Sequence, residues 1–370
     1  KIIKMKKINS VLVLALLLMS CGSKLVKQDK IQKMKSFSSV DIEVILADST
    51  LNVRALEVIK DEDGFAFLTS KGQFGVYMKP DIIENSKQDY TKIFPVQLKY
   101  GDSIIPNFRA LAANTKSGFG ISIGNPTLIY KLKASAGESK VVYIENHEKA
   151  FYDAMEFWNE EEGIAIGDPT EDCMSIIITR DGGDTWTKLS CDVLPKAKEG
   201  EAAFAASDTN IAIVGDKTWV ATGGKASRVL YSADKGQTWT VFETPIVQGV
   251  GTTGMYSIDF YDALNGFAIG GDYTKADANE ANKIRTKDGG KTWELVAQNQ
   301  NPGYRSCVQY VPNSDGKALV AIGFKGIDYS SDSGTTWQHL SDEGYYTLRF
   351  LNDSTAIAAG NKRISKLRFK

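Results

Sequence analysis

Short apolar runs that end in or near glycine recur along the chain from residue 64 to residue 360. Their side chains alternate over a few positions, which is typical of β-strands and too short for helices. No convincing amphipathic helix pattern follows residue 37. The sequence therefore predicts an all-β domain of repeated strands. The second strand of each repeat is predicted at residues 64–69, 118–124, 163–167, 211–215, 266–270, 318–323 and 356–360.

Four copies of one motif, Ser/Thr-x-Asp-x-Gly-x-Thr-Trp, occur between residues 179 and 337. Its aspartate can accept backbone N–H groups across a tight turn, its glycine permits a positive φ, and its tryptophan can pack on a neighbouring strand. These properties indicate hairpin turns rather than a binding site. The copies begin at Thr179, Ser232, Thr286 and Ser330, a spacing typical of propeller blades.

A four-strand repeat predicts seven propeller blades within a single domain over residues 38–370. The last blade has only three strands, and residues 40–47, which precede the first blade, can supply its fourth and remove the exposed edge. Six blades with a separate N-terminal strand pair is the alternative. The innermost strands of the seven blades are predicted to begin near Val53, Phe108, Tyr152, Glu201, Met255, Tyr304 and Tyr345.

The first 37 residues have the pattern of an export signal followed by a tether. Four lysines precede the apolar run 11–19, which is too short to span a bilayer as a helix. The run leads into Leu18-Met19-Ser20-Cys21-Gly22, which resembles a lipobox. Residues 1–20 are therefore expected to be a signal peptide, and residues 21–37 a tether lipidated at Cys21. We expect an outer-membrane lipoprotein that faces the periplasm, with the cell surface as the alternative.

The composition argues against several classes of function. The chain has 44 basic and 45 acidic residues, so it lacks the basic excess of a nucleic-acid binder. It has two histidines and no Cys-x-x-Cys pair, so no metal site is predicted. It also lacks the glycine-rich loops of nucleotide and dinucleotide sites. We expect a monomer with no cofactor, no metal ion and no nucleic-acid partner.

Three cysteines follow Cys21 along the chain. Cys173 and Cys191 flank the first motif copy and are expected on facing strands. In an oxidising periplasm they are candidates for a disulfide, and two reduced, buried thiols are the alternative. Cys307 lies on a predicted innermost strand and is expected to be in the core.

One position near the start of each innermost strand is charged or a tyrosine in every predicted blade. In a propeller these starts lie on the same face as the loops after the second strands, and the motif turns lie on the opposite face. The side chains should therefore surround the mouth of the central channel, with a cationic and an acidic side. They are Arg54, Arg109, Asp153, Glu201, Tyr256, Arg305 and Tyr346.

Loops on the same face are expected to add further polar groups. Asp168, Asp216 and Asp272 follow predicted second strands, and His147 precedes the third blade. We interpret the whole set as candidate ligand-binding residues. A network of arginine–carboxylate pairs that closes the channel without binding anything is the structural alternative.

The four motif copies resemble the Asp box of the BNR repeat, which occurs in sialidase-like proteins. In those proteins three arginines grip a carboxylate, an aspartate is the acid/base, and a tyrosine–glutamate pair supplies the nucleophile. The resemblance implies Arg54, Arg109 and Arg305 as the grip. It implies Asp153, Glu201 and Tyr256 as catalytic residues. The chain departs from that group in its blade order, in its predicted seven blades, and in lacking Arg-Ile-Pro at the first arginine.

The repeats also resemble the YCF48-like, photosystem-assembly-factor-like propellers, which are seven-bladed, exported and bind protein partners. The predicted blade count and the sequence Phe108-Arg-Ala-Leu fit this group better. Bacterial lipoproteins of this type are often labelled oxidoreductase, but the chain shows no cofactor motif. We therefore expect a non-catalytic lipoprotein that binds an anionic glycan or a protein partner at the funnel. A sialidase-like glycoside hydrolase and a YCF48-like assembly scaffold are the alternatives.

Overall fold

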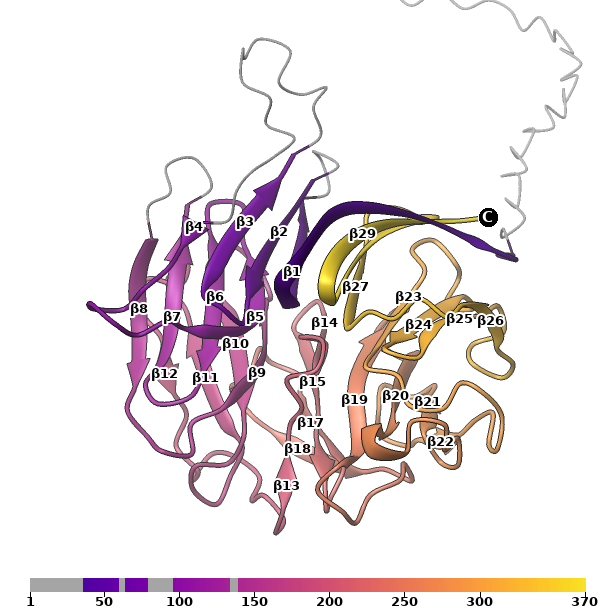
Figure 1. Ribbon diagram of the computed structural model, residues 1–370. Coiled ribbons are helices and arrows are strands. Elements are labelled where there is room, and N and C mark those ends of the chain that lie inside the picture. Colours follow the sequence, from indigo (N-terminus) through magenta and orange to yellow (C-terminus); the bar gives the residue numbers. More distant parts are fainter. Residues whose placement is uncertain (1–35, 60–63, 79–95, 134–138) are drawn as a thin grey trace, which may run out of the picture. The chain divides into compact units, whose positions relative to one another are not determined.

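The computed structural model describes residues 36–59, 64–78, 96–133 and 139–370 (Figure 1). The expected signal peptide, Cys21 and nearly all of the expected tether lie outside these residues. Residues 35–370 form one compact unit. The regular secondary structure of the described part is β-strand, apart from one short 3₁₀-helix, η3 (Tyr273–Lys275). None of its helices is long and apolar enough to cross a membrane.

Four of the antiparallel sheets contain four strands each, ordered from the innermost strand outward. The first two are β5 (Asn107–Ala113), β6 (Gly118–Ile123), β7 (Thr127–Leu132) and β8 (Ser139–Glu145), then β9 (Tyr152–Phe157), β10 (Gly163–Gly167), β11 (Ser175–Thr179) and β12 (Thr187–Lys188). The other two are β14 (Ile211–Val214), β15 (Lys217–Ala221), β17 (Arg228–Ser232) and β18 (Thr240–Glu243), then β23 (Cys307–Tyr310), β24 (Leu319–Gly323), β25 (Gly326–Ser330) and β26 (Gln338–Ser341).

Two larger sheets complete the described part. The six-stranded sheet contains β13 (Glu201–Ala202), β16 (Gly223–Gly224), β19 (Thr253–Phe260), β20 (Gly266–Asp272), β21 (Lys283–Thr286) and β22 (Glu294–Leu295). The seven-stranded sheet contains β27 (Thr347–Phe350), β28 (Thr355–Ala359), β29 (Asn361–Phe369), β1 (Val40–Ile59), β2 (Gly64–Thr69), β3 (Gln73–Tyr77) and β4 (Val96–Gln97). The innermost strands contact one another in a closed ring, β1–β5–β9–β14–β19–β23–β27–β1.

Strand β1 belongs to two halves of the seven-stranded sheet. Its first half pairs with β29, from Val40 opposite Phe369 to Ala47 opposite Arg363. Its second half pairs with β2, from Val53 opposite Thr69 to Ile59 opposite Gly64. The pairing of residues 40–47 with the C-terminal strand is the one predicted from the sequence. It closes the ring with two hydrogen-bonded strands from opposite ends of the domain.

Two predicted strand assignments in one blade are wrong. Residues 211–215 were expected as a second strand, but β14 is the innermost strand of its sheet, and the second strand is β15. The innermost strand was expected to start at Glu201, but Glu201 lies on β13, which pairs with β16. The pattern Ile-Ala-Ile-Val-Gly of β14 is that of a second strand, so the sequence alone could not separate the two.

The chain between β13 and β14 crosses the central channel; we call residues 203–209 the channel segment. Ser207 Oγ donates to the Ser306 carbonyl (2.6 Å), and Thr347 Oγ1 donates to the Ser207 carbonyl (2.7 Å). These contacts connect the segment to the chain just before β23 and to β27. The channel is therefore filled by backbone rather than open.

Asp208 is the centre of the channel segment. Its carboxylate accepts the backbone N–H of Leu111 on β5 (2.8 Å) and of Met155 on β9 (3.1 Å). Its carbonyl accepts a hydrogen bond from Arg349 Nη2 (2.8 Å), and Arg349 Nε also donates to Glu57 Oε1 (3.2 Å). One buried side chain thus satisfies inward-facing N–H groups of two neighbouring sheets.

Apolar side chains pack between neighbouring sheets. Ile164 and Ile176 of one sheet pack with Val220 and Leu230 of the next in one fully buried cluster. Trp219 and Phe260 stack between the following two sheets, with ring centroids 3.7 Å apart. The hydrophobic core is therefore distributed around the ring, and this leaves polar side chains to line its axis.

The motif copies form hairpin turns that share the aspartate–threonine hydrogen bonds, and the last three copies add an indole hydrogen bond that Trp186 of the first copy lacks. In the first copy, Asp181 accepts both the backbone N–H and the hydroxyl of Thr185, at 2.9 and 2.6 Å. Gly183 has a φ of 79°, which a residue with a Cβ rarely adopts. In the second copy the indole N–H of Trp239 donates to the Gly236 carbonyl (3.1 Å). The motif aspartates make these hydrogen bonds within their own turns, so their role is structural.

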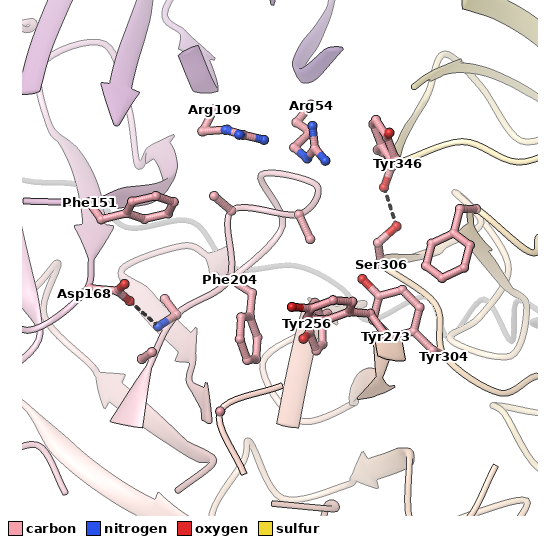
Figure 2. Close-up of a pocket in the computed structure, with 16 residues that line it drawn as sticks. Arg54, Arg109, Phe151, Asp168, Phe204, Tyr256, Tyr273, Tyr304, Ser306 and Tyr346 are labelled. Carbon is pink, nitrogen blue, oxygen red and sulfur yellow. Dashed lines mark hydrogen bonds between the residues drawn. The ribbon is translucent and has the colours of Figure 1, made fainter. Parts of the chain in front are cut away.

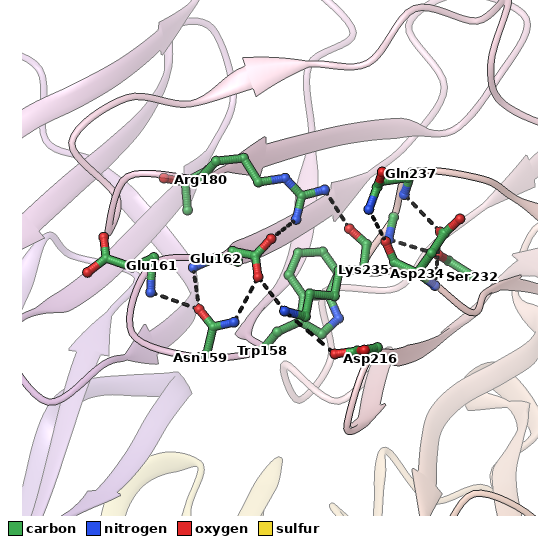
Figure 3. A network of polar contacts seen from close by, with 12 residues as sticks. Trp158, Asn159, Glu161, Glu162, Arg180, Asp216, Ser232, Asp234, Lys235 and Gln237 are labelled. Carbon is green, nitrogen blue, oxygen red and sulfur yellow. Dashed lines mark hydrogen bonds and ion pairs between the residues drawn. The ribbon is translucent and has the colours of Figure 1, made fainter.

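Polar contacts connect the first two motif turns across adjacent sheets (Figure 3). Glu162 pairs with Arg180 (2.7 Å) and with Lys235. Arg180 also donates to the Lys235 carbonyl (2.6 Å), and its guanidinium lies over the Trp158 ring at 5.4 Å. The Trp158 indole N–H donates to Thr218 Oγ1 (2.7 Å), so the contacts join the β9–β12 sheet to the β14–β18 sheet.

Cys173 and Cys191 form a disulfide that closes a loop around the first motif turn, with a sequence separation of 18 residues. Cys307 is free and fully buried on β23, in the core position expected from the sequence. The disulfide ties the chain before β11 to the chain after β12, which has only two residues in strand conformation.

We expect the double substitution Cys173→Ala/Cys191→Ala to lower the free energy of unfolding by about 3 kcal/mol, because the crosslink restricts the unfolded chain. Denaturant titration of both proteins measures this. Reductant should shift the wild-type midpoint toward that of the double variant and leave the double variant unchanged. A wild-type midpoint that does not respond to full reduction would contradict the prediction.

We expect Asp208→Ala to destabilise the protein by about 2–4 kcal/mol, because it leaves two buried N–H groups unsatisfied and removes a carboxylate beside Arg349. Thermal and denaturant unfolding measure the loss. Asp216→Ala is the matched control, because Asp216 is largely exposed and should change stability by less than about 0.5 kcal/mol. Equal midpoints for the two variants would show that the channel segment is not stabilised through Asp208.

Candidate functional site

A cavity of about 570 Å³ lies at one mouth of the channel, above the channel segment (Figure 2). The starts of innermost strands and the loops after second strands meet there, as expected for the functional face. The lining contains two arginines, one aspartate, a large group of aromatic rings and several small residues. The aromatic residues are Phe151, Phe204, Tyr256, Tyr273, Tyr304, Phe324 and Tyr346.

Arg54 on β1 and Arg109 on β5 project from neighbouring innermost strands. The Arg54 guanidinium lies over the Tyr346 ring, 4.0 Å from its centroid, and hydrogen-bonds Asn52. The buried Nε of Arg109 has no hydrogen-bond partner. Within the described part of the chain, neither arginine forms an ion pair with a carboxylate. The cavity therefore presents two adjacent cations that form no ion pair with a carboxylate of the described residues.

Burial lowers the pKa of both arginines. For Arg109 the pKa falls to about 10, first because burial disfavours the charged form and then because Arg54 repels it, while Asp153 opposes the shift. Burial is also the main cause for Arg54. Both groups remain cationic at neutral pH. Their charge is held in a partly desolvated place, where an anion is attracted more strongly than in open water.

Two carboxyl groups lie on the β9–β10 side of the cavity. Asp168 lines it, accepts the Ala203 backbone N–H (2.8 Å), and has its pKa raised to about 6 by burial. Asp153 is fully buried, and burial, with Asp168 as a second cause, raises its pKa well above the usual range. Neither oxygen of Asp153 makes a well-formed hydrogen bond. Burial favours the neutral form of Asp153, so this group weakens the positive charge little, whereas Asp168 is neutral at pH 5 and mostly ionised above its pKa of about 6.

Five aromatic side chains form a continuous surface on another side of the cavity. We call Phe204, Tyr256, Tyr273, Tyr304 and Phe324 the aromatic wall. Ring centroids lie 3.9 Å apart for Phe204 and Tyr256, 4.8 Å for Tyr256 and Tyr304, and 5.4 Å for Tyr304 and Phe324. Tyr273 contacts both Tyr256 and Tyr304 at 6.4 Å. The wall joins rings from the channel segment, β19, η3 and two further loops.

The structure brings five of the predicted site residues into this cavity. Arg54, Arg109, Tyr256 and Tyr346 come from or just before innermost strands, and Asp168 comes from the loop after β10. These residues lie where the sequence predicted them, at the mouth of the channel. Their functional roles stay predictions.

Two of the predicted charged residues are held by partners elsewhere. Arg305 is buried; its Nε donates to Asp328 Oδ2 (2.6 Å), and Tyr304 and Ser306 line the cavity in its place. Glu201 is also buried and accepts hydrogen bonds from Arg228 Nε (3.0 Å) and from the Thr222 hydroxyl (2.7 Å). At these two positions the structure has arginine–carboxylate pairs, as the alternative to a ligand-binding role expects.

The remaining predicted polar residues do not line the cavity. Asp216 lies in the β14–β15 turn beside Lys235 (3.5 Å), on the side of the motif turns (Figure 3), because β14 is an innermost strand. His147 Nδ1 accepts the Lys149 backbone N–H (3.1 Å). Asp272 caps η3 by accepting the Thr274 N–H (3.0 Å). Neither His147 nor Asp272 faces the cavity, although Asp272 directly precedes Tyr273.

The implied catalytic set does not surround this cavity. Tyr256 lines it, with its hydroxyl donating to the Thr252 carbonyl (2.8 Å). Asp153 lies behind the lining, and Glu201 is held by Arg228. No group of three or more His, Cys, Asp or Glu side chains in the described residues could hold a metal ion.

Sequence reasoning missed most of the aromatic wall. Tyr304 lines the cavity directly before Arg305, and the strand pairings align Ser306, rather than Arg305, with Tyr346. Tyr273 and Phe324 lie in loops that follow second strands, where attention to aromatic as well as acidic residues would have found them. Phe204 belongs to the channel segment, which the pattern of the chain did not reveal.

Comparison with known proteins identifies the fold. No protein-family model and no curated protein sequence matches the chain. A solved structure described as YCF48 bound to D1 peptide is similar, with a TM-score of 0.63, 13% identity, and coverage of 90% of this chain and 98% of that chain. YCF48 from Cyanidioschyzon merolae has a TM-score of 0.60 and 11% identity, with coverage of 90% of this chain and 99% of that chain. The RRP9 WD40 repeats have a TM-score of 0.60 and 9% identity, with coverage of 91% of this chain and 100% of that chain. At these identities the likeness shows the fold alone: the chain is an all-β propeller.

Proposed function

We propose that this propeller is a binding module that holds an acidic segment of a partner protein in the channel-mouth cavity, without turnover. The observation that carries the proposal is the pair Arg54 and Arg109, which face the cavity without a carboxylate partner in the described chain. Desolvated charges are costly when unpaired, so a ligand carboxylate would recover free energy there. A guanidinium can hold a carboxylate through two parallel hydrogen bonds.

Two considerations favour a protein ligand over an anionic glycan. Arginine, tyrosine and phenylalanine are the residue types enriched at protein interfaces, and they make up most of the lining side chains. A structurally similar propeller is described as bound to a peptide, so the fold can hold one. An anionic glycan remains a distinct outcome of the experiment below.

The positions of the acidic residues favour binding over glycoside hydrolysis. Most glycosidases need two carboxyl groups flanking the scissile bond, about 5–10 Å apart, and sialidases replace one by a tyrosine. Here Glu201, the expected partner of Tyr256, is engaged by Arg228, and Asp153 lies behind the cavity surface. A sialidase-like reaction would require both acids to move.

We also propose that the closed ring of innermost strands be counted as seven blades, with β1 shared between the first and the last. The lipid anchor expected at Cys21 lies outside the described residues. As a proposal, it would restrict the partner to proteins that are exported or embedded in the cell envelope. The BNR and sialidase resemblances bear on the repeat rather than on the ligand.

We expect Arg109→Ala to weaken binding of an acidic peptide by about 10- to 100-fold, because a charge-assisted hydrogen bond is lost. The probe is an acetylated, amidated hexapeptide with one aspartate among serines, measured by calorimetry against the full chain. Arg368→Ala is the control, because Arg368 is half-exposed and pairs with Glu43. Equal affinity for Arg109→Ala and wild type, or binding of sialyllactose alone, would contradict a peptide site.

We expect the affinity for the acidic probe to fall about three- to tenfold as the pH rises from 5 to 7.5. Asp168 has a pKa of about 6, so it is neutral at the lower pH and opposes an anion once it ionises. Asp168→Asn should remove the dependence, and Asp172→Asn, an exposed neighbour, should keep it. A pH profile that is the same with and without Asp168 would show that this carboxyl does not face the ligand.

A further inference from the structure

The aromatic wall gives the cavity a second, chemically different side. The charged residues that line the cavity are Arg54, Arg109 and Asp168, and in Figure 2 the arginines lie apart from Tyr256, Tyr273 and Tyr304. A volume of about 570 Å³ is far larger than one carboxylate requires and lies within the range of about 300–1,000 Å³ typical of ligand sites. The arginines therefore account for only part of the cavity.

We propose that the aromatic wall is a subsite for an aromatic side chain, carried by the same peptide segment whose acidic group binds Arg54 and Arg109. This inference rests on the proposed function and specifies its ligand: a segment with an acidic and an aromatic residue close together. The wall and the arginines then select two features at once, which one charge contact does not do.

The ring geometry of the wall supports this occupant. Tyr256 and Tyr304 meet edge to face at 87°, and Phe204 stacks flat on Tyr256 at 5°. Aromatic rings prefer these two arrangements, so an added ring continues a pattern that the wall already has. Two of the phenol groups do not compete with a ligand carboxylate for the arginines: burial raises the pKa of Tyr304 and so favours its uncharged form, and the Tyr256 hydroxyl donates to the Thr252 carbonyl.

Exposure points to the part of the wall that a ligand would cover. Tyr273 is 49% exposed and Phe324 is 44% exposed, whereas Tyr256 and Tyr304 are buried. Large aromatic side chains left half in water beside a cavity are typical of binding surfaces. The residues around Phe204 in the channel segment, Ala203 and Ala205 among them, are small and leave the floor accessible.

Charge complementarity favours a peptide over a purely apolar ligand. A lipid tail or an uncharged aromatic molecule would cover the wall but leave both arginines without a counter-ion. An acidic segment without an aromatic residue would pair with the arginines but leave the aromatic wall uncovered. A segment with both residues satisfies the whole lining, and Asp and Phe side chains a few residues apart are within reach of a single cavity.

The experiment compares hexapeptide probes on the full chain. The acidic probe has one aspartate among serines, and the acidic–aromatic probes carry in addition one phenylalanine, moved through the other five positions. We expect at least one of these probes to bind about three- to tenfold tighter than the acidic probe. Phe324→Ala and Tyr273→Ala should remove this gain and keep the affinity for the acidic probe. Leu264→Ala, an exposed apolar residue outside the lining, should keep both.

The outcomes separate the subsite from the proposed function. If the acidic probe binds through Arg109 but phenylalanine brings no gain at any position, the aromatic subsite is excluded and the proposed function stands. If the gain persists in both Phe324→Ala and Tyr273→Ala, the aromatic wall is not the subsite. If an asparagine–phenylalanine probe binds as tightly as its aspartate counterpart, the two-feature ligand is excluded. Absence of any binding dependent on Arg109 would remove the proposed function itself.

Discussion

The hydrogen bonds of Asp208 are the constraint on which the interior of the ring depends. Innermost strands of a closed ring turn some backbone N–H groups toward the channel, where no further strand can pair with them. Asp208 satisfies two of these groups, on β5 and β9, while Arg349 binds its carbonyl from β27. The channel segment is thereby fixed across the axis, and it becomes the floor of the cavity.

The buried and partly buried arginines differ in whether a carboxylate of the described chain pairs with them. Arg228, Arg305 and Arg349 each have a carboxylate partner, in Glu201, Asp328 and Glu57. Arg54 and Arg109 are partly buried, yet Arg54 contacts an aromatic face and an amide, and the buried Nε of Arg109 has no hydrogen-bond partner in the described chain. Because the other three show that this fold can pair a buried arginine, the two exceptions support the proposal that an external anion binds there.

The sequence predicted the features that local chemistry determines. The motif turns follow from their aspartates and glycines, the β1–β29 pairing from a missing outer strand, and Arg54 and Arg109 from strand starts. Prediction from the sequence failed where the path of the backbone leaves no recognisable pattern in the local sequence. In the sequence the channel segment resembles a loop and β14 resembles a second strand, so Glu201 and Asp216 were predicted at the wrong places in the sheet. At Arg305 a shift of one residue turned the side chain away from the cavity, because strand side chains alternate.

Strand β1 has a consequence for how the molecule comes apart. In an open array of repeats the terminal units can fray while the others stay folded, since each contacts only its neighbours. Here β1 is hydrogen-bonded to β29 on one half and to β2 on the other, so no repeat is terminal. Detaching β1 would break two sheet halves together and open the ring. Loss of the cavity's shape should therefore accompany the opening of the ring, and unfolding should be more cooperative than in an open array of repeats.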